Sequence, residues 1–543
     1  MKKLLLYINT IKYLKISQIF YRIKRRLIRI IGIKSDKFYL KKPKKKWVKS
    51  ELVAHNITDN LEANFLNFKK KLNLPKDWNS KKLPKLWVYN LHYLENLVSI
   101  GGAERVSFNL SFLDSWIKDN PSPTEVGWEP YPTSLRLSNA LIAWLNGLPL
   151  TNIHFKSLYR QSQYLSKNLE KDILGNHYFA NLKALFFAGI IFQRMDWSSA
   201  CLNELKKQIL EQIHEDGGNF ELSPMYHSII LKDMLDIYNL FCAYKIKDNN
   251  FKHWLQKSIF KMLNYLDKTS HGNKLSFFND SVDGIAPESC QIFDYAEKLG
   301  IKLNQNIKEG FYINDFSKSG YIVAEIDGAK TIFDAGKIGP DYQPGHAHAD
   351  TLSIEFSFEG EKYIVNSGIS EYGDTKLRHF QRSTKSHSTV EINGKNSSEI
   401  WSSFRVGNRA KIVNRHFKID EKELILNACH DGYSRVFRPC VHSRKISMKK
   451  DQLSVTDVIH GKFNSAISRF YFHPSLDFDF QKEKLIISGL NCQLILETSK
   501  LDFALKDTYY YPEFGLSIPN KCLEINFFGN KSEVVFLIHE LSQ

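Results

Sequence analysis

Apolar residues recur every three or four positions through the first half of the chain, from about residue 51 to 315. The clearest examples are segments 179–192, 228–244 and 254–266. This spacing places apolar side chains on one face of an α-helix. The connections between the segments are short, which favours antiparallel neighbours. We therefore predict a domain of helical hairpins over residues 51–315.

After Phe316 the pattern changes to an alternation of apolar and polar residues, which is typical of β-strands. The short runs are bounded by Gly, Asn and Asp, residues that favour turns. They include YIVAEI, KTIFDA, TLSIEFSF, KYIVNSG, STVEING, RKISMKK, QLILETS and EVVFLIHE. This pattern predicts an antiparallel β-sandwich over residues 316–543, following the helical domain.

Residues 1–50 form an N-terminal arm with a composition of its own. The 543-residue chain has a formal net charge of +17, and seventeen basic residues stand in this arm against one acid, Asp36. The rest of the chain is nearly neutral, so its long-range attraction for a polyanion is weak. Leu and Ile alternate with the charges at helical spacing, which predicts amphipathic helices. Such helices are suited either to an anionic membrane surface or to docking on the folded body.

Several other roles are not expected. The basic residues lie in no nucleic-acid reader motif, so we predict no nucleic-acid partner. Asn9, Lys12 and Lys15 interrupt the first apolar run and no small-residue cleavage site follows, which disfavours a cleaved signal peptide. No apolar stretch is long enough for a membrane-spanning helix. The seven cysteines are scattered without paired spacing, so neither a zinc knot nor a disulfide scaffold is implied.

The main chemical signal is GPDYQPGHAHAD, residues 339–350, which runs directly into the apolar segment TLSIEFSF. In an extended strand His346, His348 and Asp350 would share one face, the face that the following apolar residues bury. Two imidazoles and a carboxylate placed there are suited to metal ligation or to proton transfer. The alternative is a hydrogen-bonded strand edge, the ordinary role of buried polar groups.

Two helix entries carry further candidates. Asn176 and His177 precede a helical run, where Asn176 is either a plain N-cap or a donor to a ligand carboxylate. Ser223 and Pro224 predict the start of another helix, with Tyr226 in its first turn. If the phenol is partly exposed there, the positive helix end favours its ionised form, by at most about 1 kcal/mol. A core tyrosine is the alternative for Tyr226.

A polar loop, RSTKSHSTVEING, delivers His387 to the start of a period-two segment. Together with His348 and a residue near Asn366, His387 could complete a nitrogen and oxygen site for a divalent metal such as zinc.

These segments, taken in order, resemble the heparinase II/III-like polysaccharide lyases over residues 86–442. The segments that carry the resemblance are LWVYNLHYLENL, WEPYPTSLRLSNAL, GNHYFANLKAL, SPMYH, GHAHADTLSIEF and RSTKSHSTVEINGK. The resemblance implies an (α/α) toroid followed by an antiparallel β-sandwich, with the active site between them. It also implies β-elimination at a uronic acid: C5 loses a proton, the 4-O-glycosidic bond breaks, and an unsaturated sugar remains.

The resemblance also implies roles for single residues. Asn176, with His177, matches the position that neutralises the substrate carboxylate. Tyr226 matches the general acid, which can also act as a base, and His346 matches the catalytic imidazole. Among the metal positions His348 and His387 match. The family's usual Asp appears here as Asn366, so the metal, Zn or Ca, would be held more weakly, held by Asp350 instead, or absent.

The functional hypothesis is therefore a lyase for an acidic polysaccharide, without an organic cofactor. Arg136, His227, Arg382 and Arg405 are candidates for substrate contact, although each arginine also fits an ordinary surface salt bridge. The alternatives are a hydrolase or transferase acting on a cell-surface glycan during its assembly, and a non-catalytic glycan-binding protein. The resemblance implies the cell envelope or periplasm, and the absence of a cleavage site keeps a cytoplasmic or membrane-peripheral location open.

Overall fold

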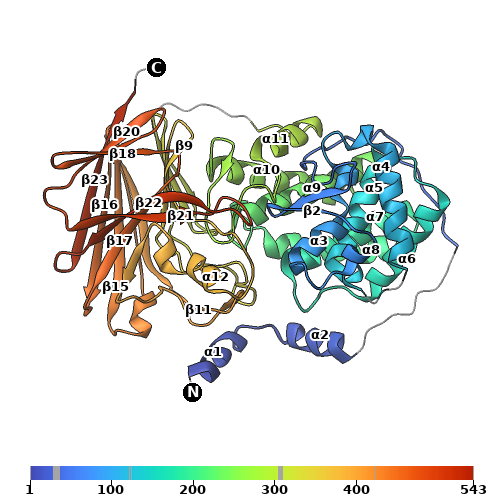
Figure 1. Cartoon of the computed structure of the whole chain (residues 1–543), viewed down its shortest axis with the longest axis horizontal. Coiled ribbons are helices and arrows are strands. Elements are labelled where there is room, and N and C mark those ends of the chain that lie inside the picture. Colours follow the sequence, from blue (N-terminus) through green and yellow to red (C-terminus); the bar gives the residue numbers. More distant parts are fainter. Residues whose placement is uncertain are drawn as a thin grey trace.

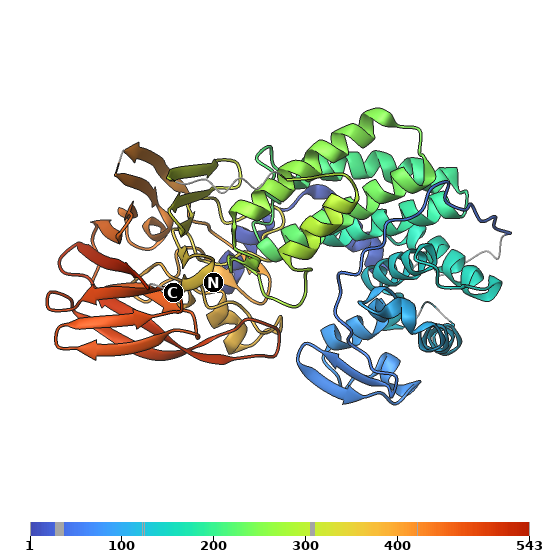
Figure 2. The same ribbon diagram turned by 90° about the horizontal axis from the view of Figure 1, so that it is seen from above.

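The computed structural model describes residues 2–27, 37–121, 123, 125–303, 310–420 and 422–541. A helical body and a β-body lie side by side, and the first two helices run along one edge of both (Figure 1). Seen from above, the two bodies again lie side by side and adjoin in the middle (Figure 2). The predicted class, helical hairpins followed by antiparallel sheets, is confirmed. Residues 28–36 of the predicted arm lie outside the described residues.

The helices follow the predicted apolar periodicity: segment 179–192 coincides with α7 up to Ile191, and the segments 228–244 and 254–266 fall within α9 and α10. The helices are α1 (Lys2–Ile11), α2 (Ile16–Leu27), α3 (Lys85–Tyr93), α4 (Val106–Asp119), α5 (Pro130–Leu145), α6 (Asn152–Lys167), α7 (Gly175–Ile191), α8 (Met195–Gln212), α9 (Pro224–Tyr244), α10 (Asn249–Lys268), α11 (Ser289–Lys298) and α12 (Lys376–Gln381). In the part of the chain that the structure describes, no helix combines the length and the apolar character needed to cross a membrane.

Helix α7 is the centre of the helical body. Most of its residues are apolar and they are distributed around the whole helix, as expected of a helix that is surrounded by others. It packs against α5, α6, α8 and α9, and nearly all of its side chains are buried. Because α7 is fixed on every side, the residues of its first turn are held rigidly at the edge of the body.

The β-body consists of two antiparallel sheets. The first has the order β21 (Phe503–Tyr510), β22 (Ile518–Asn526), β17 (Ala466–Phe472), β9 (Glu361–Val365), β8 (Ile354–Phe358), β7 (Ala329–Asp334), β6 (Tyr321–Ile326) and β5 (Phe311–Phe316), and β10 (Val390–Ile392) also pairs with β17. The second has the order β13 (Ile412–Asp420), β14 (Glu423–His430), β15 (Cys440–Lys449), β16 (Gln452–Gly461), β23 (Lys531–Glu540), β20 (Cys492–Glu497), β19 (Lys484–Ser488) and β18 (Asp477–Gln481).

Three two-stranded sheets complete the described strands. They are β1 (Glu62–Phe65) with β2 (Phe68–Lys71), β3 (Ser270–His271) with β4 (Lys274–Leu275), and β11 (Ile400–Trp401) with β12 (Arg405–Val406).

The two large sheets share one apolar core. Strand β14 alternates half-buried and buried residues, which is the pattern of a strand with one face on a core. Leu424 and Leu426 of β14 belong to the same cluster as Ile322 of β6, Phe470 of β17 and Phe536 of β23. This cluster holds the β-sandwich together independently of the helical core.

The segment between α10 and α11 fastens the helical body to the sandwich. His271 contacts Ser357 Oγ at 2.7 Å and Glu355 Oε2 at 3.1 Å, and all three side chains are buried. The main-chain N–H of Phe277 donates to Glu355 Oε1 at 2.9 Å. These contacts hold residues 277–281 against the sandwich, so that Asn279 and Asp280 lie at the seam between the two bodies.

Candidate active site

A cavity of about 920 Å³ lies between the helical body, the loops of the sandwich and the N-terminal arm. Asn176 and His177 of α7, Tyr226 of α9, and His346 of the sandwich loops all line it. Residues predicted as catalytic from segments more than a hundred positions apart therefore meet in one space. Tyr372, which the sequence did not single out, lines the same cavity.

The HAHAD segment is a loop, and β8 begins only at Ile354. Leu352 has a φ of 64°, which turns the chain before the strand. The predicted row of side chains on a strand face is therefore wrong. His346 and His348 still converge, because both imidazoles contact the same carboxylate, Asp280. Asp350 contacts the residue that precedes Asp280. Its Oδ2 accepts from the main-chain N–H of Asn279 at 3.3 Å.

Asp280 is the shared acceptor of the site. Its Oδ2 lies 2.9 Å from His346 Nδ1 and its Oδ1 lies 2.8 Å from His348 Nε2. The guanidinium of Arg378 donates to both oxygens, at 2.7 Å for Oδ2. Burial alone would raise the pKa of Asp280, but Arg378 and the two imidazoles outweigh it and hold this pKa well below its ordinary value. Asp280 is therefore an ionised carboxylate that can only accept hydrogen bonds.

This carboxylate determines the tautomer of His346. Because Asp280 accepts at Nδ1, the neutral imidazole carries its proton there and presents an unprotonated Nε2. Glu221 Oε2 lies 3.5 Å from that Nε2 and is buried. Burial raises the pKa of Glu221, opposed mainly by the charge of His346. His346 is therefore arranged to take up a proton, with a carboxyl group beside it to stabilise the imidazolium.

Tyr226 occupies the first turn of α9, as the sequence predicted. Ser223 Oγ accepts from the N–H of Tyr226 at 3.2 Å, and Pro224 is the first helical residue. The phenol ring stacks on His346, with ring centroids 3.9 Å apart, and its hydroxyl lies 3.0 Å from the hydroxyl of Tyr372.

The phenol is not partly exposed, so the condition for easier ionisation at the helix end is not met. Burial, followed by the neighbouring Tyr372, raises the pKa of Tyr226 well above its ordinary value of 10.0. Withdrawal from water therefore outweighs the small effect of the helix end. Tyr226 is a neutral hydroxyl, which is the protonation state that a proton donor needs.

Asn176 is not an N-cap. The cap position of α7 is Leu174, without a side-chain cap hydrogen bond, and Asn176 lies inside the first turn with Gly175 before it. Gly175 has a φ of 52°, and a Cβ there would lie 2.7 Å from Glu221 Oε1 and 2.2 Å from Gln343 Nε2. The close approach places the positive end of α7 beside the carboxyl group that flanks His346.

His177 follows on the cavity side of α7. Its ring stacks on that of Tyr131, with centroids 4.2 Å apart, and its Nδ1 lies 3.3 Å from Glu170 Oε1. The stack and the carboxylate fix the orientation of the imidazole at the cavity wall.

Of the four residues predicted to contact substrate, one lines the cavity and three do not. Arg405 lines the cavity, with its guanidinium over the rings of Tyr7 and Trp401. The remaining three side chains are buried and do not line the cavity. Arg136 stacks on Trp116 and donates to Gln161, Arg382 donates to main-chain carbonyls including that of Ala347, and His227 Nε2 contacts the carbonyl of Met262. In this structure those three side chains bind protein groups and support the walls of the site.

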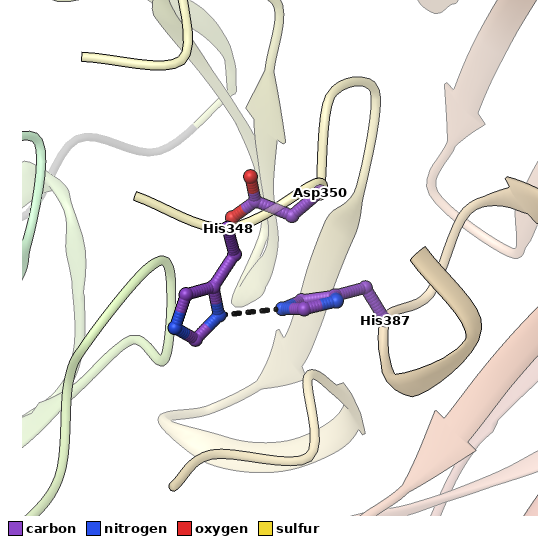
Figure 3. A group of neighbouring side chains, drawn as sticks. All are labelled: His348, Asp350 and His387. Atoms are coloured by element: carbon purple, nitrogen blue, oxygen red, sulfur yellow. Dashed lines mark hydrogen bonds between the residues drawn. The ribbon is translucent and has the colours of Figure 1, made fainter. Parts of the chain in front are cut away.

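A possible metal centre lies behind His346. His348, Asp350 and His387 are buried, and one ligand atom of each lies within 4.8 Å of the others. Figure 3 shows the two imidazoles facing each other with the carboxylate beside them; His348 Nδ1 and His387 Nε2 are 3.0 Å apart. The predicted pair of histidine ligands is therefore brought together, with Asp350 as the third group.

The hydrogen bonds of the two imidazoles fit a cation. His387 Nδ1 faces the carbonyl of Ser383 at 2.7 Å and His348 Nε2 faces Asp280, so each of these nitrogens carries the proton. The two nitrogens that face each other then both present lone pairs. Burial lowers the pKa of His348 to about 3 and also lowers the pKa of His387, which disfavours a proton between them. A divalent ion with N and O ligands, such as Zn²⁺, satisfies this arrangement.

Asn366 differs from its predicted role. Its Oδ1 accepts from the N–H of Ser388 at 3.1 Å, and its Nδ2 faces Glu355. This amide therefore orders the loop that carries His387, while Asp350 takes the place among the candidate ligands that the prediction gave to Asn366.

Sequence reasoning missed four residues of the site: Glu221, Asp280, Tyr372 and Arg378. Glu221 stands inside the segment DGGNFELSPMYH, three residues after Gly218, and could have been noticed as an acid beside the Tyr226 helix. Asp280 follows the apolar pair FF, but Asn-Asp is equally typical of a turn. Tyr372 and Arg378 carry no local signal.

Two family models match the chain. The model described as Heparinase II/III N-terminus matches residues 13–295, and the model described as Heparinase II/III-like, C-terminal matches residues 309–532. The chain belongs to the heparinase II/III-like family. Together the two models cover both bodies and every candidate catalytic residue.

Curated relatives of this heparinase II/III-like chain are similar to it over about half of its length. A heparin-sulfate lyase of Bacteroides stercoris is 26% identical over 328 residues, which is 53% of this chain and 47% of the relative. A heparin-sulfate lyase of Pedobacter heparinus is 24% identical over 264 residues, 44% of this chain and 39% of the relative. The chain thus aligns with less than half the length of either relative.

Solved structures share the fold over more of the chain. A crystal structure of heparinase III has a TM-score of 0.68 at 16% identity, covering 87% of this chain and 81% of that chain. The Streptomyces coelicolor chondroitin AC lyase has a TM-score of 0.53 at 8% identity, covering 84% and 75%. At such identities the likeness concerns the arrangement of helical body and sandwich.

The metal centre of this heparinase II/III-like chain generates a direct prediction. Protein purified with zinc present should hold roughly one ion per chain, and His387→Ala should hold almost none, because a lone imidazole and a carboxylate are too few ligands. Metal analysis of the purified protein measures this, and chelation should lower the Tm of the wild type but not of the variant.

His416 of β13 is exposed and offers the matched control. His416→Ala should keep the metal and the response to chelation. If His387→Ala bound as much zinc as the wild type, His387 would not be a ligand.

Proposed function

We propose that this protein is a polysaccharide lyase that cleaves an acidic, uronate-containing polysaccharide by β-elimination. The observation that carries the proposal is the contact between Tyr226 and His346 in the cavity that Asn176 also lines. Membership of the heparinase II/III-like family and the names of the curated relatives, heparin-sulfate lyases, support the same reaction class.

His346 is the proposed base. Its Nε2 takes the C5 proton of the uronate, and the electrons of that C–H bond move towards C4. Asp280 holds the proton of the neutral imidazole on Nδ1, so that Nε2 is the accepting atom, and it stabilises the imidazolium after the step, together with Glu221. Asp280 and His346 are arranged like other pairs in which a buried carboxylate orients a histidine base.

Tyr226 is the proposed acid. As the C4–O bond breaks, the leaving oxygen needs a proton, and the neutral phenol supplies it. The hydroxyl of Tyr372 lies 3.0 Å away and can stabilise the phenolate by donating to it. The products are an unsaturated uronate and a new hydroxyl end, and no water is consumed.

Asn176 is proposed to neutralise the substrate carboxylate. The C5 proton is weakly acidic, and its loss becomes easier when the adjacent carboxylate is held by hydrogen-bond donors. The amide of Asn176 and the positive end of α7 supply donors and partial charge at the cavity wall. His177 stands beside them for a second contact.

The charges around the cavity favour a substrate of modest charge. The lining cations are Arg22, Lys183, Lys232 and Arg405, and the lining carboxylates are Glu95, Asp172, Asp233, Asp283, Glu288 and Glu513. Lys183 and Lys232 are already paired with carboxylates of α9. Three lining carboxylates, Asp172, Asp233 and Glu288, are also paired, which leaves Glu95, Asp283 and Glu513 in the part of the chain that the structure describes. Among the described residues, Arg22 and Arg405 are the lining cations without a carboxylate at salt-bridge distance. The cavity is therefore suited to one carboxylate per repeat and poorly suited to many sulfates.

The reaction is tested by the ultraviolet absorbance of the unsaturated product during incubation with a panel of uronate polysaccharides. We expect absorbance to rise with wild-type protein, and Tyr226→Phe and His346→Gln each to lower kcat by at least about a hundredfold. Tyr244→Phe is the matched control, because its hydroxyl bonds the carbonyl of Lys41 away from the cavity. It should retain activity.

Three outcomes would contradict the proposal. Cleavage without the absorbance would indicate a hydrolase or transferase, and saturable binding without any cleavage would indicate a glycan-binding protein. Full activity of Tyr226→Phe or His346→Gln would remove that residue from the mechanism.

The charge of the preferred substrate is tested within the same panel. The ratio kcat/KM should be higher for an unsulfated uronate polysaccharide than for a heavily sulfated one of the same backbone, by roughly tenfold or more. Glu513→Gln should narrow the difference, because it removes one lining carboxylate that has no salt-bridge partner among the described residues. A higher kcat/KM for the sulfated polymer would contradict the charge argument.

A further inference from the structure

In the N-terminal arm, polar side chains face the folded body and apolar side chains face outward. Within α2 the buried side chain is Gln18, whereas Ile16 is 85% exposed and Leu27 is 78% exposed. Phe20 and Ile23 are also more than half exposed. A helix on a protein surface normally turns its apolar stripe inward. Here the stripe faces away from the body.

Polar side chains hold the arm in place. The contacts are Asn9 with Glu399, Thr10 with Trp401, Lys15 with Glu211, Gln18 with the carbonyl of Tyr342, and Arg25 with Asp172. They reach both bodies, because Trp401 belongs to β11 and Glu211 to α8. These polar contacts, together with the packing of Tyr7 on Trp401, set the orientation of the arm and leave the apolar stripe of α2 facing outward.

The outward apolar residues of α2 form one continuous stripe. With 3.6 residues per turn, the five positions fall within a sector of about 100°, and Gln18 and Arg25 lie on the opposite side. The five positions are Ile16, Ile19, Phe20, Ile23 and Leu27. Helix α1 repeats the arrangement with Leu4, Leu5 and Ile8, which are all at least half exposed and do not line the cavity.

Basic residues flank the stripe. Residues 2–27 contain eight Lys and Arg and no Asp or Glu. By the same helical geometry Lys24 and Arg26 lie on either side of the α2 stripe, and both are exposed. Figure 1 shows α1 and α2 along the same edge of the molecule, beside the sandwich and the helical body respectively.

We propose that this edge is a membrane-binding surface, on which α1 and α2 lie in the interface of an anionic lipid bilayer. Apolar side chains enter the region between headgroups and acyl chains, and the flanking cations pair with lipid phosphates. This is the pattern by which amphipathic helices bind membrane surfaces. The binding needs no rearrangement of the arm, since the polar face stays on the body.

A second copy of the chain fits this surface less well. In a two-fold symmetric dimer the same patch faces itself. Two arms, each with eight basic residues and no acid, would then repel one another across the contact. An anionic surface has the opposite charge and matches both features of the arm.

Membrane binding would also hold the cavity close to the lipid headgroups. The inner side of the arm lines it through Tyr7, Gln18 and Arg22. Since an α-helix is about 10 Å across, the cavity would lie within one helix diameter of the headgroups. The inference stands on the arm alone and does not rest on the proposed reaction.

Co-sedimentation of the full chain with vesicles tests the inference. Vesicles of phosphatidylcholine containing phosphatidylglycerol should bind the wild type, vesicles of phosphatidylcholine alone should bind it weakly, and added salt should weaken binding. The double variant Phe20→Ser with Ile23→Ser should bind roughly tenfold or more weakly. Lys24→Glu with Arg26→Glu should lose the preference for anionic vesicles.

The matched control is Leu490→Ser with Phe528→Ser. Both residues are highly exposed, in the turns between β19 and β20 and between β22 and β23, outside the arm. This variant should bind vesicles as the wild type does. Circular dichroism establishes that each variant is folded.

Three results would overturn the inference. The first is no binding of the wild type to either vesicle, and the second is equal binding by the Phe20→Ser, Ile23→Ser variant. The third is a concentration-dependent dimer that this variant abolishes, measured by sedimentation velocity, because the patch would then be a contact between copies.

Discussion

The ion pair between Asp280 and Arg378 is the interaction on which the site depends. Both side chains are fully buried, and each would be costly without the other. Because Arg378 keeps Asp280 ionised, the carboxylate can accept from His346 on one oxygen and from His348 on the other. One buried charge therefore orients the proposed base and the first candidate metal ligand together.

The same ion pair joins parts of the chain that the two bodies contribute separately. Asp280 comes from the segment after α10, Arg378 from α12, and His346 from the loop before β8. The helical body supplies Tyr226 and Asn176 at the starts of two helices, where tight packing fixes them. The cavity therefore forms where the two bodies meet, and neither body alone contains all the proposed catalytic residues. The arm closes one side of it and bridges both bodies.

The local sequence pattern was sufficient to predict the fold class and the position of Tyr226. Periodicity predicted the helical and β regions, and the cap signals of Ser223 and Pro224 placed Tyr226 correctly in its helix. Spacing alone failed where tertiary contacts decide. The turn at Leu352 removed His346 and His348 from a strand, and burial outweighed the small effect of the helix end on the pKa of Tyr226. Asp280 and Arg378 lie 98 positions apart. The sequence around each residue gives no sign that the other will pair with it.

The most direct test of this account is the turnover of Asp280→Asn, compared with Asp341→Asn, whose exposed carboxylate pairs with Arg409 outside the site. An amide cannot accept from both imidazoles as a carboxylate does, so His346 would lose the partner that sets its tautomer. The account predicts a fall in kcat of about 10³- to 10⁴-fold for Asp280→Asn, with circular dichroism unchanged and Asp341→Asn near wild type. Wild-type turnover by a folded Asp280→Asn protein would contradict it.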